Sequence, residues 1–179
     1  YKKREQEEVL SFPNSRVFER VKNIELIELV SRLYLNKNAV FVVNFSSLLQ
    51  TVPNVNQLVS SRVSLKEGEK INIVDTIGSL VSVGYEASDE ERLVKGQYRR
   101  VGDSLLIYPV NHETVCRVDL DFDKVDKIYT VEDRDYTKKD KALKTLDVFP
   151  IEVDVETGNI LDLLSGNGVV VDDEVDVVD

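Results

Sequence analysis

The first 73 residues alternate between strand patterns and helix patterns. Residues 39–45 (AVFVVNF) are apolar at all but one position, which is typical of a strand buried on both faces. Residues 23–38 have apolar positions at helical spacing, with Asn23 as the expected N-cap and one face formed by Leu26, Val30, Leu33 and Tyr34. Shorter patterns predict a strand at 8–12, a helix at 46–52 and two extended pieces within 62–73. This alternation predicts part of an α/β layer.

From Asp75 onward the pattern is that of a small α+β module with an antiparallel sheet. A helix is predicted over 75–86, with Asp75 as its cap, Gly84 as its left-handed terminator and an inward face formed by Ile77, Leu80 and Val81. Strand pairs are predicted for 97–101 with 104–108 and for 115–122 with 125–131, and a last strand near 145–150. In the second pair, one face is expected to hold Cys116, Val118, Leu120 and Phe122.

The first pair is predicted to be a two-residue hairpin around Gly102–Asp103, which fits a type II′ turn. Such a turn fixes the register, with Arg99 opposite Leu106 and Arg100 opposite Leu105. The expected core face carries Tyr98, Arg100, Leu105 and Ile107. The expected contact face carries Gln97, Arg99, Val101, Ser104, Leu106 and Tyr108. Arg99, among apolar and aromatic neighbours on this face, has the surroundings typical of an interface anchor, but the residues alone favour the alternative of a solvated arginine on an ordinary hairpin. Arg100 is expected to reach the surface only through a β-bulge or from the core edge.

The last 29 residues, 151–179, contain nine acidic residues and no Lys or Arg. Within them, residues 168–174 (GVVVDDE) have the pattern of a buried strand with an acidic end. We expect this strand to return to the sheet that contains residues 39–44. The predicted organisation is an α/β segment at 1–73, an inserted module at 74–150 and a returning acidic segment at 151–179.

The charge distribution argues against nucleic-acid binding by this chain alone. The net charge is −10, and the part outside the acidic segment holds 24 acids and 23 bases, which gives no broad positive field. No phosphate-binding loop of the type GxxxxGK[ST] is present, and no nucleophile, base and orienting group are recognisable together. We therefore expect no catalytic residues, no metal and no cofactor. The alternative is a fragment of a nucleic-acid-processing NTPase or nuclease, with an acidic metal site at residues 172–174.

The single cysteine, the single histidine and the first residue of the chain give further expectations about the protein. The one cysteine, Cys116, lies in an alternating apolar run and is expected to be a buried thiol, which suits the reducing cytoplasm. The one histidine, His112, is expected in a loop. No apolar run is long enough to span a membrane. The chain has no Met and begins with Tyr1, so we expect it to be a piece of a longer protein.

Several phrases occur in the order and spacing of a known module. They are LVSVGYE at 80–86, GQYRRVGDSLLIYP at 96–109, CRVDLDFDKVDKI at 116–128 and LDVFP at 146–150, with flanking phrases SSLLQTVPN, SLKEGEKINI and ILDLLSGNGVVVDDE. Together they resemble the UvrB-homology region at the N-terminal end of bacterial transcription-repair coupling factor (Mfd), and the middle part is similar to domain 2 of UvrB. The resemblance covers most of residues 9–175.

This resemblance implies a protein–protein interaction module that docks UvrA, the damage-recognition ATPase of nucleotide excision repair. The longer parent is then expected to be an ATP-dependent DNA translocase that also contacts RNA polymerase and DNA, while this part is not an enzyme. The residues expected to bind the partner are Arg99, Arg100, Tyr98, Val101, Leu106 and Tyr85.

The chain departs from the family pattern at the arginines linked to UvrA docking. Where UvrB reads F-R-V-R-G-D, residues 98–103 read Y-R-R-V-G-D, so the first arginine matches Arg99 and the second is replaced by Val101. The family arginine after G-Y-E is Ala87. The resemblance therefore implies a UvrA-docking surface with a changed set of arginines.

Overall fold

The computed structural model describes residues 9–11, 19–35, 40–44, 51–132, 136–137, 139–151, 157–159 and 168–172. The chain divides into two compact units, residues 58–154 and residues 1–57 together with 155–179. The larger unit begins at residue 58, earlier than the expected boundary at 74, because the strand at 63–66 pairs with the strand at 145–148. It ends at residue 154, close to the expected boundary at 150.

The smaller unit contains a sheet of three parallel strands. These are β1 (Val9–Ser11), β2 (Val40–Asn44) and β13 (Gly168–Asp172), with β2 in the middle. Gly168 lies opposite Val40, and the pairing continues to Asp172 opposite Asn44. The predicted return of the chain to the sheet containing residues 39–44 is therefore confirmed. A second, antiparallel pair joins β3 (Thr51–Pro53) to β12 (Thr157–Asn159).

Helix α1 (Glu19–Leu35) begins earlier than its sequence pattern indicates. Asn23 lies inside the helix, so its predicted role as N-cap is wrong. The buried positions include Leu26 and Val30, as expected, whereas Tyr34 is 45% exposed near the C-terminal end of the helix. The helix expected at 46–52 meets strand β3 at residue 51, and the rest of it lies outside the described residues.

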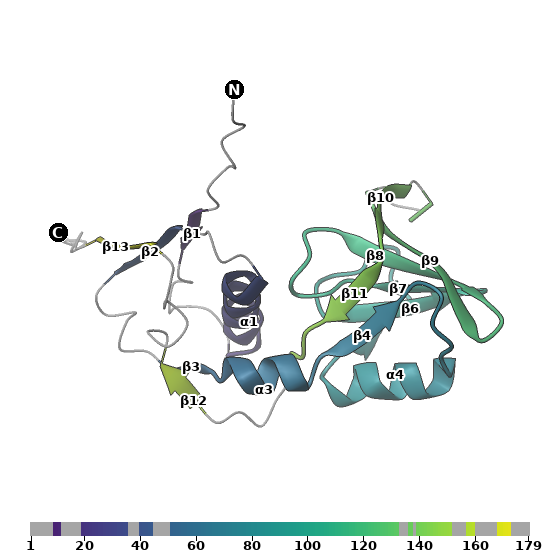
Figure 1. Ribbon diagram of the computed structural model, residues 1–179, viewed down its shortest axis with the longest axis horizontal. Helices are drawn as coiled ribbons and strands as arrows, with labels where there is room; N and C mark the ends of the chain where they lie inside the picture. The colour runs from purple at the N-terminus through teal and green to yellow at the C-terminus, as the bar shows by residue number, and fades with distance from the viewer. Residues whose placement is uncertain are drawn as a thin grey trace. The chain divides into compact units, whose positions relative to one another are not determined.

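The larger unit is built on a six-stranded sheet with the order β10-β9-β8-β7-β6-β5 (Figure 1). Its strands are β5 (Glu86–Ala87), β6 (Gln97–Val101), β7 (Ser104–Ile107), β8 (Val115–Asp121), β9 (Lys124–Val131) and β10 (Lys139–Leu143). All neighbours are antiparallel except β5 and β6, which are parallel. Both predicted strand pairs are confirmed, and the unit combines a mainly antiparallel sheet with helices.

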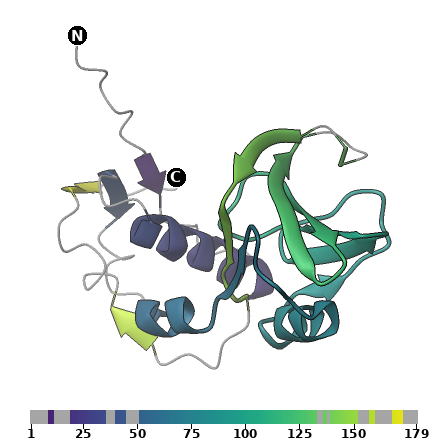
Figure 2. The same ribbon diagram turned by 45° about the vertical axis from the view of Figure 1, so that its right-hand side comes forward.

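A two-stranded ribbon and a helix accompany this sheet. Strand β4 (Val63–Lys66) pairs with β11 (Thr145–Val148), and both α4 (Ile73–Ser82) and β9 contact β4 (Figures 1 and 2). Helix α3 (Val55–Ser60) leads into β4. Alternate residues of the sheet point toward one core, which includes Leu105, Ile107, Cys116, Val118 and Ile128, each at most 1% exposed. Leu65, Leu80 and Leu146 are buried from the ribbon and the helix.

The N-cap of α4 lies a few residues before the predicted one, whereas the glycine that ends the helix is the predicted one. The N-cap is Asn72, whose Oδ1 accepts a hydrogen bond of 2.9 Å from the Val74 N–H, so the predicted cap Asp75 lies in the first turn. Gly84 has φ of +93°, which confirms it as the left-handed terminator. Leu80 is buried as expected, but Val81 is 54% exposed.

The carboxylate of Glu67 joins β4 to the sheet. It accepts hydrogen bonds from Lys127 and, at 2.7 Å, from Lys144, and these bonds lower its pKa to about 2. A carboxyl group whose pKa falls on folding stabilises the native state above its ordinary pKa of 4.5 and loses that contribution as the pH falls toward 2. We expect the free energy of unfolding to fall across this pH range, and Glu67→Gln to reduce the fall. Urea denaturation at a series of pH values measures it, with Glu91→Gln as the exposed control.

Candidate functional site

The β6–β7 hairpin has the register that its sequence predicts. Tyr98 pairs with Ile107, Arg99 with Leu106, Arg100 with Leu105 and Val101 with Ser104, without a shift. Gly102 has φ of +57°, while Asp103 is not among the residues with positive φ, in agreement with a type II′ turn. The hairpin is therefore regular up to its turn.

Arg100 is exposed on this regular strand, so of the two expected routes the bulge is absent and Arg100 reaches the surface from the edge of the core face. It shares a face with the buried Tyr98, but the core does not extend as far as residue 100. Its Nε donates a hydrogen bond of 3.2 Å to the Gly102 carbonyl. Val101, the next residue, is 52% exposed. The end of β6 therefore presents both a guanidinium group and an apolar side chain.

Arg99 is held against the protein and does not stand free on the sheet. Its Nη1 donates a hydrogen bond of 2.8 Å to the Glu90 carbonyl, and its guanidinium carbon lies 5.4 Å from the centre of the Tyr136 ring. Its Nε is buried and has no hydrogen-bond partner among the described residues. Arg99 thus fixes the connecting segment, residues 88–96, to the sheet.

The expected contact face is therefore partly covered. Leu93 of the connecting segment, Leu106, Val115, Val131 and Tyr136 form a small second core on it, with Tyr108 packed against them. The Leu93 N–H donates a hydrogen bond of 2.7 Å to the Tyr136 hydroxyl. The connecting segment has no alternating pattern of apolar and polar residues, so its position over the sheet was not predictable from periodicity.

Replacing Arg99 by alanine should loosen the connecting segment. The change removes one hydrogen bond and one cation–π contact, worth together about 1–2 kcal/mol of the free energy of unfolding. We expect faster limited proteolysis within residues 88–96 in Arg99→Ala, measured against wild type by mass spectrometry. Arg100→Ala, which touches no part of the segment, is the matched control and should be cleaved at the wild-type rate.

Beyond the second core, the same face carries a hydrogen-bonded charge network. Asp119 accepts a hydrogen bond of 2.6 Å from Arg117, one of 2.8 Å from Ser104 and one of 3.1 Å from Lys139. Burial raises the pKa of Asp119, but the three hydrogen bonds outweigh it, so its pKa is lowered. Arg117 also donates to the Tyr136 carbonyl at 3.2 Å. These charges are satisfied within the fold.

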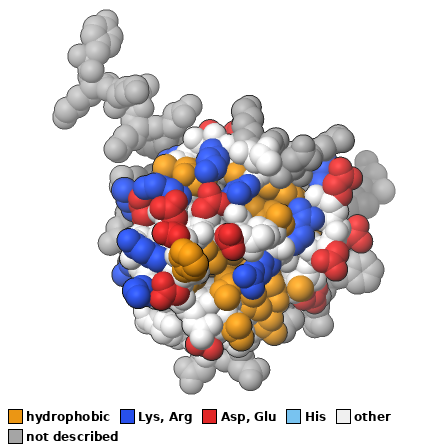
Figure 3. Space-filling view, turned by 90° about the vertical axis from the view of Figure 1, so that its right-hand side faces the viewer, with side chains coloured by type: hydrophobic (Ala, Val, Ile, Leu, Met, Phe, Trp, Pro, Cys, Tyr) orange, Lys and Arg blue, Asp and Glu red, His pale blue; other side chains and the backbone are white. Residues whose placement is uncertain are grey.

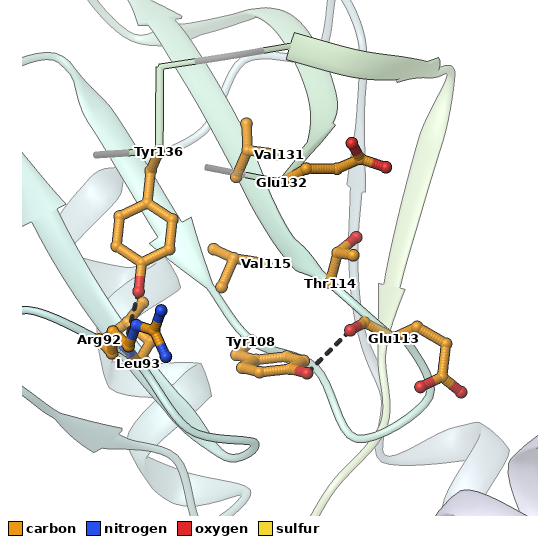
Figure 4. Close-up of a pocket in the computed structure, with 9 residues that line it drawn as sticks. All are labelled: Arg92, Leu93, Tyr108, Glu113, Thr114, Val115, Val131, Glu132 and Tyr136. Atoms are coloured by element: carbon orange, nitrogen blue, oxygen red, sulfur yellow. Dashed lines mark hydrogen bonds between the residues drawn. The ribbon is translucent and has the colours of Figure 1, made fainter. Parts of the chain in front are cut away.

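A pocket of about 440 Å³ opens beside the second core (Figure 4). Leu93, Val115 and Val131 give it apolar walls, and the tyrosine hydroxyls are engaged, since Tyr108 donates to the Glu113 carbonyl at 2.8 Å. Figure 4 shows Arg92 on the side of Tyr136, and Glu113 and Glu132 on the opposite side. The charged groups do not converge on one point, which favours contact with another molecule over catalysis.

Three residues expected to bind a partner are buried. Tyr85 is 1% exposed, Tyr98 is 7% exposed and Leu106 is 3% exposed. The Tyr85 hydroxyl donates to the Phe149 carbonyl at 3.0 Å and accepts from the Val110 N–H at 3.2 Å, and burial raises its pKa. Of the six expected residues, Arg100 and Val101 are the exposed ones.

Phe122, which was expected to share a face with Cys116, Val118 and Leu120, lies at the surface. Phe122 is 97% exposed at the turn of the β8–β9 hairpin, and not on a face with Cys116 and Val118. The register of this hairpin shifts between Asp119 and Leu120, and Phe122 has φ of +55°, so the period-two alternation ends before it. Phe122 follows the end of β8 that pairs with the other hairpin turn, since the Leu120 N–H donates to the Asp103 carbonyl at 2.8 Å.

The remaining chemical groups do not form a reactive site among the described residues. Cys116 is fully buried, as expected, and burial raises its pKa to about 12. His112 lies in the loop after β7, and its pKa is lowered mainly by burial. No group of three or more His, Cys, Asp or Glu suited to a metal ion occurs in the described part of the chain. Asp172 ends β13, while Asp173 and Glu174 lie outside the described residues.

On the face shown in Figure 3, hydrophobic side chains lie in patches between Lys, Arg, Asp and Glu side chains of both signs. Within the described ranges, none of the helices is both long enough and apolar enough to span a membrane.

Comparison with known proteins identifies the larger unit. The UvrB interaction domain family matches residues 63–153, about half of the chain. UvrABC system protein B of Methanococcus maripaludis is 34% identical over 105 residues, which are 59% of this chain and 16% of that protein. The transcription-repair-coupling factor of Borreliella burgdorferi is 24% identical over 126 residues, 70% of this chain and 11% of that protein.

UvrABC system protein B of Fervidobacterium nodosum is 31% identical over 97 residues, 53% of this chain and 14% of that protein. The chain thus spans less than a fifth of the length of each of these relatives. The matched range of 63–153 closely follows the compact unit at 58–154 and begins with β4, which the sequence pattern had placed in the preceding segment. The resemblance to the UvrB-homology region is confirmed, and the chain belongs to the UvrB interaction domain family.

Proposed function

We propose that this chain is a non-catalytic docking module that recruits UvrA in nucleotide excision repair, as part of a transcription-repair coupling factor. Membership of the UvrB interaction domain family supports a role in protein interaction, and the relatives include both UvrB proteins and a transcription-repair-coupling factor. The observation that carries the proposal is the exposed end of β6, where Arg100 and Val101 face solvent.

The end of β6 combines side-chain and backbone groups that suit a protein partner. In a two-residue hairpin, residues 99 and 101 exchange hydrogen bonds with the neighbouring strand, so the N–H and C=O of residue 100 point away from it. Strand β5 pairs with β6 only at residues 97 and 98. The backbone of Arg100 therefore lies on an open sheet edge, and its guanidinium group offers the planar donors that interfaces favour.

The distribution of chemistry in the unit favours binding over catalysis. Arg117 and Asp119 are engaged with each other, Cys116 is buried, and the charges around the pocket lie on opposite sides. The near balance of acids and bases outside the acidic segment gives no field for DNA. We extend the proposal to the longer parent, which would be an ATP-dependent DNA translocase that contacts RNA polymerase and DNA through its other parts.

Isothermal titration calorimetry of the 179-residue chain against UvrA tests this proposal. We expect saturable binding with one module per UvrA site, since the exposed end of β6 is a single surface. Bovine serum albumin at the same concentration serves as a control for non-specific association. Absence of binding to UvrA, both with and without bound nucleotide, would rule the proposal out.

A further inference from the structure

Phe122 stands out as a large apolar side chain that the fold does not use. It is 97% exposed at the tip of the β8–β9 hairpin, whereas the other exposed large hydrophobic residues of this unit are 52–71% exposed. Scattered exposed apolar residues are normal on protein surfaces, so exposure alone carries no meaning. Phe122 differs from the other exposed apolar residues in its backbone conformation and in the hydrogen bonds that hold its turn in place.

The backbone of Phe122 is in the left-handed region, with φ of +55°. A bulky L-residue is uncommon there, because its Cβ comes too close to the following carbonyl oxygen. Glycine or asparagine occupies such a turn position at lower cost. The chain therefore keeps an aromatic residue at a position where it strains the backbone and contributes almost no packing, which points to a role outside the fold.

Hydrogen bonds from the segment before α4 hold the tip of the β8–β9 hairpin, which carries Phe122, in place. The Ile71 N–H donates a hydrogen bond of 2.7 Å to the Asp123 carbonyl, and the Val125 N–H donates one of 2.9 Å to the Glu69 carbonyl. Lys70 Nζ lies 3.3 Å from Asp123 Oδ2. The backbone around Phe122 is thus fixed before any partner arrives, which lowers the entropy lost on binding.

The position of Phe122 connects it to the exposed end of β6. The hydrogen bond from the Leu120 N–H to the Asp103 carbonyl, 2.8 Å long, joins the turn of the β6–β7 hairpin to β8 two residues before Phe122. Phe122, Arg100 and Val101 therefore belong to the same end of the sheet. An aromatic side chain and an arginine are the residue types that dominate binding energy at protein interfaces.

We propose that Phe122 is the aromatic anchor of the docking surface and inserts into an apolar pocket on UvrA, an inference that rests on the proposed function. Asp121 and Asp123 flank Phe122, and Lys70 pairs with Asp123, while the stem of Lys124 lies near Gly68. Phe122 thus lies between two acidic residues in the sequence, and the chain carries a net charge of −10. Both oppose the approach of phosphate groups, so the occupant is a protein pocket and not stacked nucleic-acid bases. The pocket is expected to have basic residues at its rim.

The test compares the full chain with the variants Phe122→Gly and Phe122→Asn. Both relieve the left-handed strain, so we expect the melting temperature to rise by about 4 °C or more. Both remove the anchor, so we expect UvrA binding in isothermal titration to weaken roughly tenfold or more. Val81→Ser, which changes a 54% exposed apolar residue on α4, is the matched control and should bind as wild type does.

The possible results distinguish a failure of this inference from a failure of the proposed function. If wild type binds UvrA and both Phe122 variants bind equally well, the inference is overturned and the proposed function stands. If wild type does not bind UvrA, the proposed function fails and the inference falls with it. A lower melting temperature in both variants would assign Phe122 a structural role. Retention of wild type on single-stranded DNA that both variants lose would make nucleic acid the occupant.

Discussion

Replacing Arg100 by alanine is expected to weaken UvrA binding roughly thirtyfold, which corresponds to about 2 kcal/mol. The arginine lies on the exposed end of a regular strand and makes one hydrogen bond there, to its own turn at Gly102. Its removal therefore leaves the fold intact and deletes a group that a partner can desolvate. Isothermal titration of Arg100→Ala against UvrA, with the melting temperature as a check on folding, measures both parts of this expectation.

Two further variants make the result specific to Arg100. Arg100→Lys keeps the charge but loses the planar fork of donors, so it should recover only part of the affinity. Arg92→Ala removes an exposed arginine at the pocket beside Tyr136 and should bind as wild type does. Equal losses in Arg92→Ala and Arg100→Ala would show that UvrA responds to overall charge and not to the end of β6.

Replacing Tyr85 by phenylalanine is expected to lower the free energy of unfolding by about 2 kcal/mol, because it leaves two buried backbone groups without a partner. The Tyr85 hydroxyl joins the Phe149 carbonyl, at 3.0 Å, to the Val110 N–H, at 3.2 Å, and the side chain is 1% exposed. These groups come from segments far apart in the sequence. Urea denaturation of wild type and Tyr85→Phe gives the difference in the free energy of unfolding. The dependence of this free energy on urea concentration is assumed to be the same for both.

Tyr98→Phe is the matched control for this change. Tyr98 is also buried, at 7% exposed, but the structure gives its hydroxyl no hydrogen bond to any described residue. We expect a change in the free energy of unfolding well below 1 kcal/mol for Tyr98→Phe. A similar loss in both variants would mean that the two hydrogen bonds of the Tyr85 hydroxyl do not stabilise the fold. A loss of UvrA affinity in Tyr85→Phe without a loss of stability would restore Tyr85 as a contact residue.

Local patterns were enough to predict the hairpins but not the extent of burial on them. Alternation and the Gly102–Asp103 turn predicted the register of β6 and β7 residue by residue. Alternation assigns faces but does not say where a core ends, so the sequence placed Arg100 on the core face and left open whether a bulge or the edge of the core exposes it. At Phe122 the pattern failed for a different reason, because a turn in the left-handed region interrupts the period-two geometry.

Two sets of contacts were not predictable from local patterns. Strand β4 was assigned to the preceding segment because nothing local shows that it pairs with β11, which lies about eighty residues later. The connecting segment has no regular period, so its cover over Leu106 and the role of Arg99 beneath it were also missed. The return of β13 to β2 was predicted, because a strongly apolar run needs a buried partner strand.

The central claim is that the end of the sheet formed by Arg100, Val101 and Phe122 docks UvrA. Hydrogen–deuterium exchange of the full chain, read by NMR at single amides, tests it most directly. The Arg100 N–H lies on an open edge, so it should exchange rapidly in the free chain. We predict that UvrA slows exchange at Arg100 and at Phe122, and leaves the amides around Glu113 unchanged. Slowing that is confined to the pocket residues near Glu113, with none at Arg100 or Phe122, would contradict the claim.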